Sequence, residues 1–235
     1  VYGWRRGMEA IVGALLPQES LAAGPVLEVG CGRGDLLAAL AAGGAPGPLW
    51  GVDLHIDPLG VEHAIPVQLL RADAQRLPFA DGASGLVLAL DVLDQRSVDA
   101  PVLLAECRRV LRAEGLLVVR VSAHPRLYGP HDVAFNTGRR YRRRELTDLL
   151  LAAGYAIERM TYVDSLVAAP VAALRLLQRT GLVGLNEELY RARWSNRLLS
   201  GALGWEARWL HRHDFPLGLS LLALARPTKF ARISR

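Results

Sequence analysis

The sequence predicts an α/β protein with an open, mostly parallel seven-stranded sheet and helices on both faces. Short apolar runs bounded by glycine or turn residues alternate with stretches of helical periodicity, which is typical of such a sheet. Glycines follow the first apolar run directly, as in the first turn of many open α/β sheets. The 235-residue chain is 51% hydrophobic, enough for one sizeable core. We therefore expect residues 1–235 to form a single domain.

The elements are expected in the following order. Residues 1–20 form a helical lead that Pro17 ends, since apolar residues recur on one helical face: Trp4, Met8, Ile11, Val12 and Leu15. Strands are expected at residues 25–30, 49–54, 67–70, 86–90, 116–121, 155–162 and 217–225. Helices are expected at 35–42 and 100–111, the second with Asp99 as N-cap and Gly115 as its stop.

The chain is expected to divide into four parts. After the lead, residues 21–163 form a core with the early strands, and residues 216–227 carry the final strand. Between them, residues 164–215 have a helical pattern that interrupts the sheet before its last strand. We expect this insertion to cover one end of the sheet as a lid.

Composition excludes several classes of protein. No apolar run reaches the roughly 18 residues of a membrane span, and no signal-peptide pattern is present. Cys31 and Cys107 are too few for a disulfide framework or a four-ligand zinc site, so no metal is expected. A cytoplasmic monomer or homodimer is the default. The net charge of +5 is the sum of −4 over residues 1–120 and +9 over residues 121–235, so the basic charge is confined to the second half.

The sharpest local signal is a glycine turn. The run Val26-Leu-Glu-Val leads directly into Gly30, Gly32 and Gly34, and a helix is expected from Asp35. Glycine permits positive φ and removes Cβ, so the backbone can approach a ligand closely at the carboxyl end of the strand. The next expected strand ends in Asp53, and an acid at this place can accept both hydroxyls of a ribose.

Two classes of ligand share this geometry. Enzymes that bind dinucleotides use G-x-G-x-x-G, but here Asp35 stands at the place of the last glycine. A carboxylate beside a pyrophosphate would be repelled. With Glu28 just before the turn, the pattern favours a ligand that has a ribose and a positively charged end, such as S-adenosylmethionine.

At this point the sequence resembles the class I S-adenosylmethionine-dependent methyltransferases, which have a Rossmann-like fold. The stretch 26–34 is similar to their first motif and Gly51-Val-Asp-Leu54 to their second. Arg71-Ala-Asp-Ala-Gln-Arg-Leu-Pro-Phe79 resembles the third, and Arg109-Val-Leu-Arg-Ala-Glu-Gly115 the turn before the fifth strand. The family often has Glu-His after the fourth strand, where this chain has Asp94-Gln95 and therefore no histidine base.

The resemblance implies a cofactor site around the turn. Gly30, Cys31 and Gly32, in a motif completed by Gly34, would contact the methionine part of S-adenosylmethionine. Glu28 would organise the turn or reach the ammonium group through water. S-adenosylhomocysteine would be the product.

The other implied cofactor contacts come from the next strands. Asp53 would hold the ribose hydroxyls, and Leu54 would pack on the adenine. Asp73 would accept from the adenine amino group, with a backbone contact from Ala74. Two residues would line the pocket near the sulfonium: Leu90 and Asp91. A second interpretation makes Asp91 the cap of a following helix.

A second constellation follows the fifth strand. A subgroup of this family, similar to methyltransferase types 11 and 12, carries an H-D…R-R-Y segment there, and this chain has His131-Asp132 and Arg139-Arg140-Tyr141. His131, with Asp132, is the best-placed general base, because its ordinary pKa is near neutrality. The alternative is that the pair only shapes the loop. Likewise, Arg139, Arg140 and Tyr141 either hold an anionic acceptor or brace the loop.

The resemblance thus predicts methyl transfer by in-line displacement to a small-molecule or lipid-like acceptor of the secondary-metabolite type. Two alternatives stay open. The cofactor of a non-methylating enzyme would serve a pericyclic or rearrangement step instead. An RNA methyltransferase is the second alternative, but the arginine-rich segment has no aromatic stacking platform beside it, so no nucleic-acid partner is expected.

Overall fold

The computed structural model describes residues 2–56, 67–179 and 193–228. Its sheet has seven strands in the order β3-β2-β1-β4-β5-β7-β6, and only β7 runs antiparallel to its neighbours. The strands are β1 (Val26–Val29), β2 (Leu49–Asp53), β3 (Val67–Arg71), β4 (Ser84–Leu90), β5 (Leu111–Ser122), β6 (Tyr155–Val163) and β7 (Ser220–Pro227). This confirms the predicted fold class.

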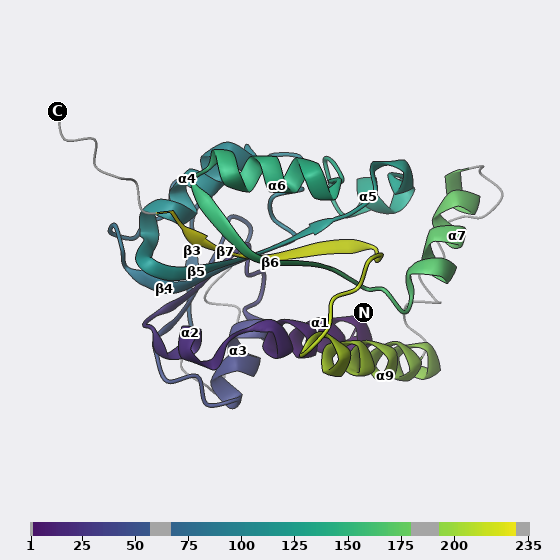
Figure 1. Ribbon diagram of the computed structural model, residues 1–235, viewed down its shortest axis with the longest axis horizontal. Coiled ribbons are helices and arrows are strands. Elements are labelled where there is room, and N and C mark those ends of the chain that lie inside the picture. The colour runs from purple at the N-terminus through teal and green to yellow at the C-terminus, as the bar shows by residue number, and fades with distance from the viewer. Residues whose placement is uncertain (1, 57–66, 180–192, 229–235) are drawn as a thin grey trace.

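Helices cover both faces of the sheet (Figure 1). On one face lie α4 (Ala100–Val110) and α6 (Arg143–Ala152), and on the other α1 (Tyr2–Leu15), α2 (Gln18–Ala22), α3 (Asp35–Ala42) and α9 (Arg193–Leu210). The short α5 (Pro130–Ala134) and α7 (Ala168–Arg179) lie beyond the carboxyl ends of the parallel strands. Residues 180–192 of the expected insertion lie outside the described residues.

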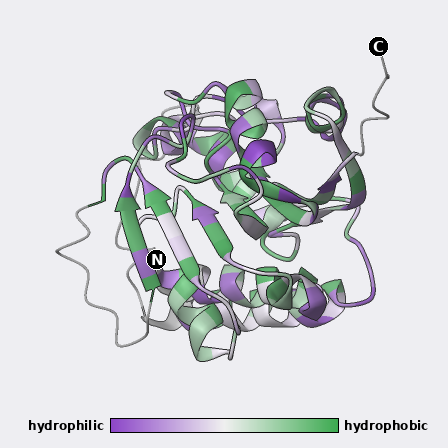
Figure 2. Ribbon diagram, turned by 90° about the vertical axis from the view of Figure 1, so that its left-hand side faces the viewer, coloured by the Kyte–Doolittle hydropathy of each residue, from purple (hydrophilic) through white to green (hydrophobic). Residues whose placement is uncertain are grey.

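The core has two layers because successive strand residues point to opposite faces of the sheet. In β4, Val87 and Ala89 belong to the cluster shared with α4 and α6, whereas Leu86 and Leu88 belong to the cluster shared with α1, α3 and α9. Buried on both faces, such central strands have continuous apolar sequences instead of alternating ones. In Figure 2 the strands are largely hydrophobic in colour, with white and hydrophilic segments in places.

The predicted elements agree with the structure in most places. Pro17 separates α1 from α2, and the Asp99 carboxylate accepts from the N–H of Val102 at 3.2 Å as the N-cap of α4. The prediction that Gly115 ends this helix is wrong. The helix ends at Val110, and β5 begins at once and runs through Gly115, because Leu111 and residues 116–122 pair with β4 and β7.

Arg109 secures the loop that replaces a helix between β3 and β4. Its guanidinium donates to the carbonyls of Leu77 and Phe79 and pairs with Asp81 and Glu106 at 2.9 and 2.8 Å. The arginine of the sequence motif before β5 therefore anchors this loop to α4.

Candidate functional site

The glycine turn adopts a backbone that side chains disfavour. Gly30, Gly32 and Gly34 have φ values of +74°, +53° and +71°. A Cβ on Gly30 would come within 3.1 Å of Val92, whereas one on Gly32 would meet no heavy atom within 4 Å. The turn thus packs against the segment after β4 on one side and leaves open space at Gly32, where a ligand can approach the backbone.

Asp53 is held next to this turn. Its Oδ2 accepts from the N–H of Gly32 and its Oδ1 from the N–H of His55, both at 2.9 Å. Because each carboxylate oxygen can accept two hydrogen bonds, both oxygens keep capacity for further donors such as ribose hydroxyls. The structure thus brings the acid at the end of the second strand into contact with the first turn.

The remaining expected cofactor residues extend along the same edge. Because the strands lie in the order β3-β2-β1-β4, Asp73, Asp53, the turn and Leu90 follow one another across the carboxyl ends. Asp73 precedes Ala74 and accepts from the N–H of Gln75 at 2.9 Å. Leu54 is 47% exposed beside Asp53, and such an exposed apolar side chain is suited to an aromatic ligand ring.

Glu28 lies directly beneath the turn and is only 7% exposed. Burial, reinforced by Asp35 and Asp53, raises the pKa of its carboxyl group to about 8. Its Oε2 is buried without a hydrogen-bond partner among the described residues. A buried carboxyl group with an unused oxygen is costly unless a donor or cation binds there. The Cys31 thiol beside it stays protonated, since burial raises its pKa to about 12.

Asp91, at the end of β4, forms an ion pair that neither interpretation anticipated. Its carboxylate pairs with the guanidinium of Arg120 on β5, and no helix follows it, since α4 begins only after Asp99. The cap interpretation is therefore wrong. Asp91 also has a φ of +56°, a conformation that non-glycine residues seldom adopt. Burial raises its pKa to about 6, although the nearby Arg120 opposes this.

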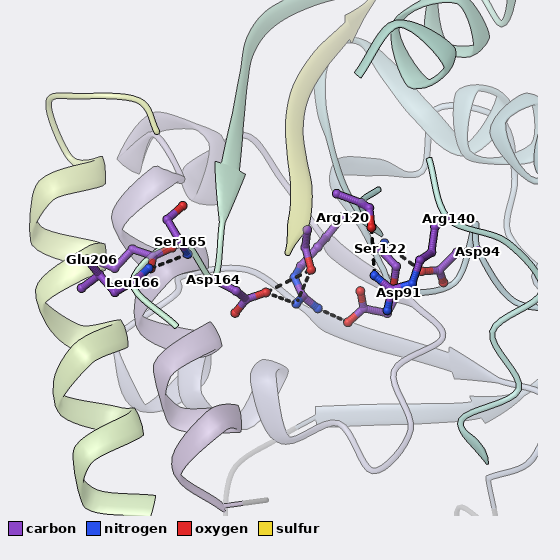
Figure 3. A network of polar contacts seen from close by, with 11 residues as sticks. Asp91, Asp94, Arg120, Ser122, Arg140, Asp164, Ser165, Leu166 and Glu206 are labelled. Carbon is purple, nitrogen blue, oxygen red and sulfur yellow. Dashed lines mark hydrogen bonds and ion pairs between the residues drawn. The ribbon is translucent and has the colours of Figure 1, made fainter. Parts of the chain in front are cut away.

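Arg120 is the centre of a polar network that sequence reasoning missed (Figure 3). It is 4% exposed and also pairs with Asp164 at 2.7 Å and donates to Ser220 Oγ at 3.0 Å. The ring of Trp4 on α1 lies 4.8 Å from the guanidinium carbon, a cation–π contact. The network joins β4, β5, β6 and β7 to α1. An arginine inside the apolar run Val118-Val-Arg-Val121 was the available signal.

Asp132, Arg140 and Tyr141 lie in the segment between β5 and α6, Asp132 within α5. Asp132 pairs with Arg140 at 2.7 Å and accepts from the N–H of Gly129, and Arg140 also donates to the carbonyl of Ala123. Tyr141, 1% exposed, donates to the carbonyl of Leu93 at 3.0 Å. These contacts agree with the alternative in which the residues brace the loop, because all three side chains are buried and bonded within the protein.

His131 and Arg139 lie at the surface of the same loop. The His131 ring stacks on Phe135 with centroids 4.5 Å apart, and burial, assisted by Arg140 and opposed by Asp132, lowers its pKa. It is therefore neutral at pH 7, the form a general base requires. Arg139 is exposed, with its guanidinium 4.4 Å from the ring centroid of Tyr141. Of the candidate acceptor ligands, Arg139 is the one whose side chain faces solvent.

Comparison with known proteins gives a family match and a set of similar folds. Residues 27–119 match the model of a family described as a methyltransferase domain. No curated protein sequence matches the chain. A SAM-dependent methyltransferase from Thermotoga maritima has 18% identity and a TM-score of 0.60 over 96% of this chain and 90% of that one.

Two further solved structures have similar folds. A geranyl diphosphate C-methyltransferase from Streptomyces coelicolor A3(2), in complex with S-adenosyl-L-homocysteine, is 16% identical with a TM-score of 0.54, covering 87% of this chain and 71% of that one. The cyclase SpnF is 21% identical with a TM-score of 0.56, covering 87% of this chain and 74% of that one. At these identities the likeness shows the fold.

Proposed function

We propose that this chain, a class I S-adenosylmethionine-dependent methyltransferase, transfers a methyl group to a small-molecule or lipid-like acceptor. The observation that carries the cofactor assignment is the open glycine turn, bonded to Asp53 and underlain by the buried, unpartnered Oε2 of Glu28. When bound, S-adenosylmethionine supplies a methyl group on a positively charged sulfur, which an acceptor atom takes by in-line displacement.

The residues present fit this cofactor at both ends. Asp53 would accept from the ribose hydroxyls, and Asp73 from the adenine amino group, with Leu54 against the adenine ring. Glu28 would face the ammonium group, either directly or through water, and the backbone of Gly30, Cys31 and Gly32, in the motif completed by Gly34, would hold the methionine chain. Two residues would line the methyl side: Leu90 and Asp91.

Arg120 would act on the reaction through Asp91. With its carboxylate paired to the buried guanidinium of Arg120, Asp91 is held in place at the end of β4 and its Oδ2 is already engaged. A proton on the acceptor would therefore pass to a different group. His131 is neutral at pH 7 and is the candidate for this role in our proposal, with Asp132 shaping its loop.

The acceptor would lie beyond the carboxyl ends of β4 and β5. In that region α5 and α7 approach each other, and we infer that α7, from the first part of the insertion 164–215, forms a wall of the acceptor pocket, whereas α9 packs beside α1 on one face of the sheet. Arg139 would bind a carboxylate or phosphate on the acceptor, whereas Arg140 and Tyr141 would act by bracing the loop. A related fold binds geranyl diphosphate, which supports a lipid-like, anionic acceptor but does not identify it.

Transfer of label from methyl-labelled S-adenosylmethionine to a panel of prenyl and acyl phosphates, carboxylates and amines tests this proposal. We expect labelled product together with S-adenosylhomocysteine for at least one acceptor class, and loss of both in the Asp53→Asn variant. An acceptor turned over without release of S-adenosylhomocysteine would instead support a rearrangement enzyme. Label found in RNA and in no small molecule would contradict the acceptor assignment.

A further inference from the structure

The outer face of α9 is unusually apolar for a helix that already buries another face. Leu203, Ala207 and Leu210 are at most 5% exposed and face the interior beside α1. On the opposite side, residues at helical spacing remain exposed, and a surface helix normally carries polar residues there. The exposed fractions are 67% for Leu198, 44% for Trp205 and 41% for Trp209.

The two tryptophans form a preorganised ridge. Their rings stack with centroids 5.5 Å apart, and Trp209 also contacts His213 and Phe215 at 4.6 and 6.1 Å. Side chains held in this way lose little conformational freedom when a surface covers them. The ridge is therefore suited to binding.

Three arginines lie beside this ridge: Arg197, Arg208 and Arg212, each exposed. Within residues 2–56, 67–179 and 193–228, none of their guanidinium groups forms an ion pair. Glu206, the acid within α9, points inward and accepts from the N–H groups of Ser165 and Leu166 (Figure 3). The face is therefore both apolar and positively charged.

We propose that this α9 outer face, made of Arg197, Leu198, Trp205, Arg208 and Trp209 together with Arg212 just after the helix, docks the protein onto an anionic lipid bilayer. Tryptophan is suited to the boundary between headgroups and acyl chains, since its ring is apolar and its N–H is polar. Arginines beside it pair with lipid phosphates. The helix lies in the plane of the surface, as interfacial amphipathic helices do, and does not span it.

The charge pattern disfavours a second copy of the chain as the occupant. A symmetric contact through this face would bring the arginines of one copy against those of the other, and like charges in an interface are costly. The exposed acid nearest in sequence, Asp214, is paired with Arg159 at 2.8 Å. RNA is disfavoured because the tryptophan rings stack on each other and offer less free face to a base.

Sedimentation with extruded vesicles tests the docking on the full chain without cofactor, so its outcome is separate from that of the proposed enzyme activity. We expect binding to phosphatidylcholine vesicles that contain phosphatidylglycerol, little binding to phosphatidylcholine alone, and a decline with added salt. Each arginine replaced by glutamine among Arg197, Arg208 and Arg212 should weaken binding about fivefold. Leu198→Gln and Trp205→Gln should weaken it at all salt concentrations.

Matched controls lie on the opposite face of the molecule. Arg144 on α6 is 92% exposed at its side chain, and Leu151 on the same helix is 55% exposed. Arg144→Gln and Leu151→Gln should bind vesicles as the unchanged protein does. Far-ultraviolet circular dichroism and S-adenosylmethionine affinity should be the same for all variants, which excludes unfolding as the cause of a loss.

Three results would overturn the inference. Equal binding to neutral and anionic vesicles would show that the arginines do not matter. Self-association that Leu198→Gln abolishes, without vesicle binding, would assign the face to a second copy. Loss of RNA affinity in the arginine variants, again without vesicle binding, would assign it to nucleic acid.

Discussion

The clearest test of the cofactor site is the pH dependence of cofactor affinity in the Glu28→Gln variant. Glu28 is buried beneath the glycine turn with a pKa of about 8, so at pH 7 it is mostly protonated in the free protein. An ammonium group bound beside it favours the ionised carboxylate. Binding below pH 8 should therefore release about one proton, and affinity should rise with pH.

The size of the effect follows from two titrations. From pH 6 to pH 8, the ionised fraction of a group with pKa 8 rises from about one in a hundred to one half. The α-ammonium group of the cofactor, with an ordinary pKa of 7.7 to 8.0, loses about half its charge over the same interval. The product of the ionised fraction of Glu28 and the charged fraction of the ammonium group rises about 25-fold. Cofactor affinity should therefore peak near pH 8 and fall above it.

Isothermal titration in buffers of different ionisation enthalpy measures both affinity and proton release. Glu28→Gln should bind S-adenosylhomocysteine as the unchanged protein does at pH 6, but about 25-fold more weakly at pH 8. 5′-Methylthioadenosine, which lacks the amino-acid part, serves as the matched ligand and should show no such rise. If Glu28→Gln retained the full pH profile, the role assigned to Glu28 would be refuted.

Glu28 also predicts a stability effect with a definite sign. The pKa of Glu28 is raised from 4.5 to about 8 in the folded protein. Its contribution to the free energy of unfolding is therefore fully present below pH 4.5 and is lost as the pH rises to about 8. The full loss is on the order of 5 kcal/mol. Urea unfolding of the ligand-free protein at pH 8.5 should therefore show Glu28→Gln to be more stable than the unchanged chain, with little difference at pH 4.5.

Four further substitutions, compared with one surface control, have defined outcomes. Arg120→Leu leaves the buried carboxylate of Asp164 and the half-buried carboxylate of Asp91 without their partner. It should lower the free energy of unfolding by about 3–5 kcal/mol in urea titrations, whereas Arg144→Gln should change it by less than about 0.5 kcal/mol. Arg139→Gln should raise the KM for an anionic acceptor and leave cofactor affinity intact. Arg140→Gln should instead lower the melting temperature measured by calorimetry. If both variants changed the KM and the melting temperature equally, the separate roles of the two arginines would be contradicted. Gly32→Val should lower cofactor affinity at least tenfold in the same titrations, through strain at φ +53° and the filled space, and unchanged affinity would show that the turn does not contact the ligand.

Local sequence determined the features that depend on neighbouring residues. The glycine turn requires positive φ at three positions, which only the residue type decides, and Asp53 lies next to it because adjacent parallel strands end at one edge. Pro17 and Asp99 interrupt and cap helices through their own backbone and side chain. These predictions needed no knowledge of distant contacts.

Predictions that depended on sequence similarity to a motif were less secure. Asp132, Arg140 and Tyr141 match a family segment, but only the fold shows that their polar groups bond Gly129, Ala123 and Leu93. The basic second half, read as one acceptor side, is in fact distributed among separate tasks. Arg159 and Arg226 pair with Asp214 and Glu158, and others remain exposed.

The sequence by itself determined the alternation of strands and helices, the turn and the acids along the cofactor edge, because periodicity and backbone conformation are local properties. Only the tertiary structure decided that Arg120 binds Asp91 and Asp164, since β4, β5, β7 and β6 must first assemble side by side in the sheet. It also decided which face of α9 is buried against α1 and which stays exposed. The sequence pattern of α9 shows two apolar stripes along the helix. The packing of the whole chain decides which stripe is buried and which is exposed to solvent.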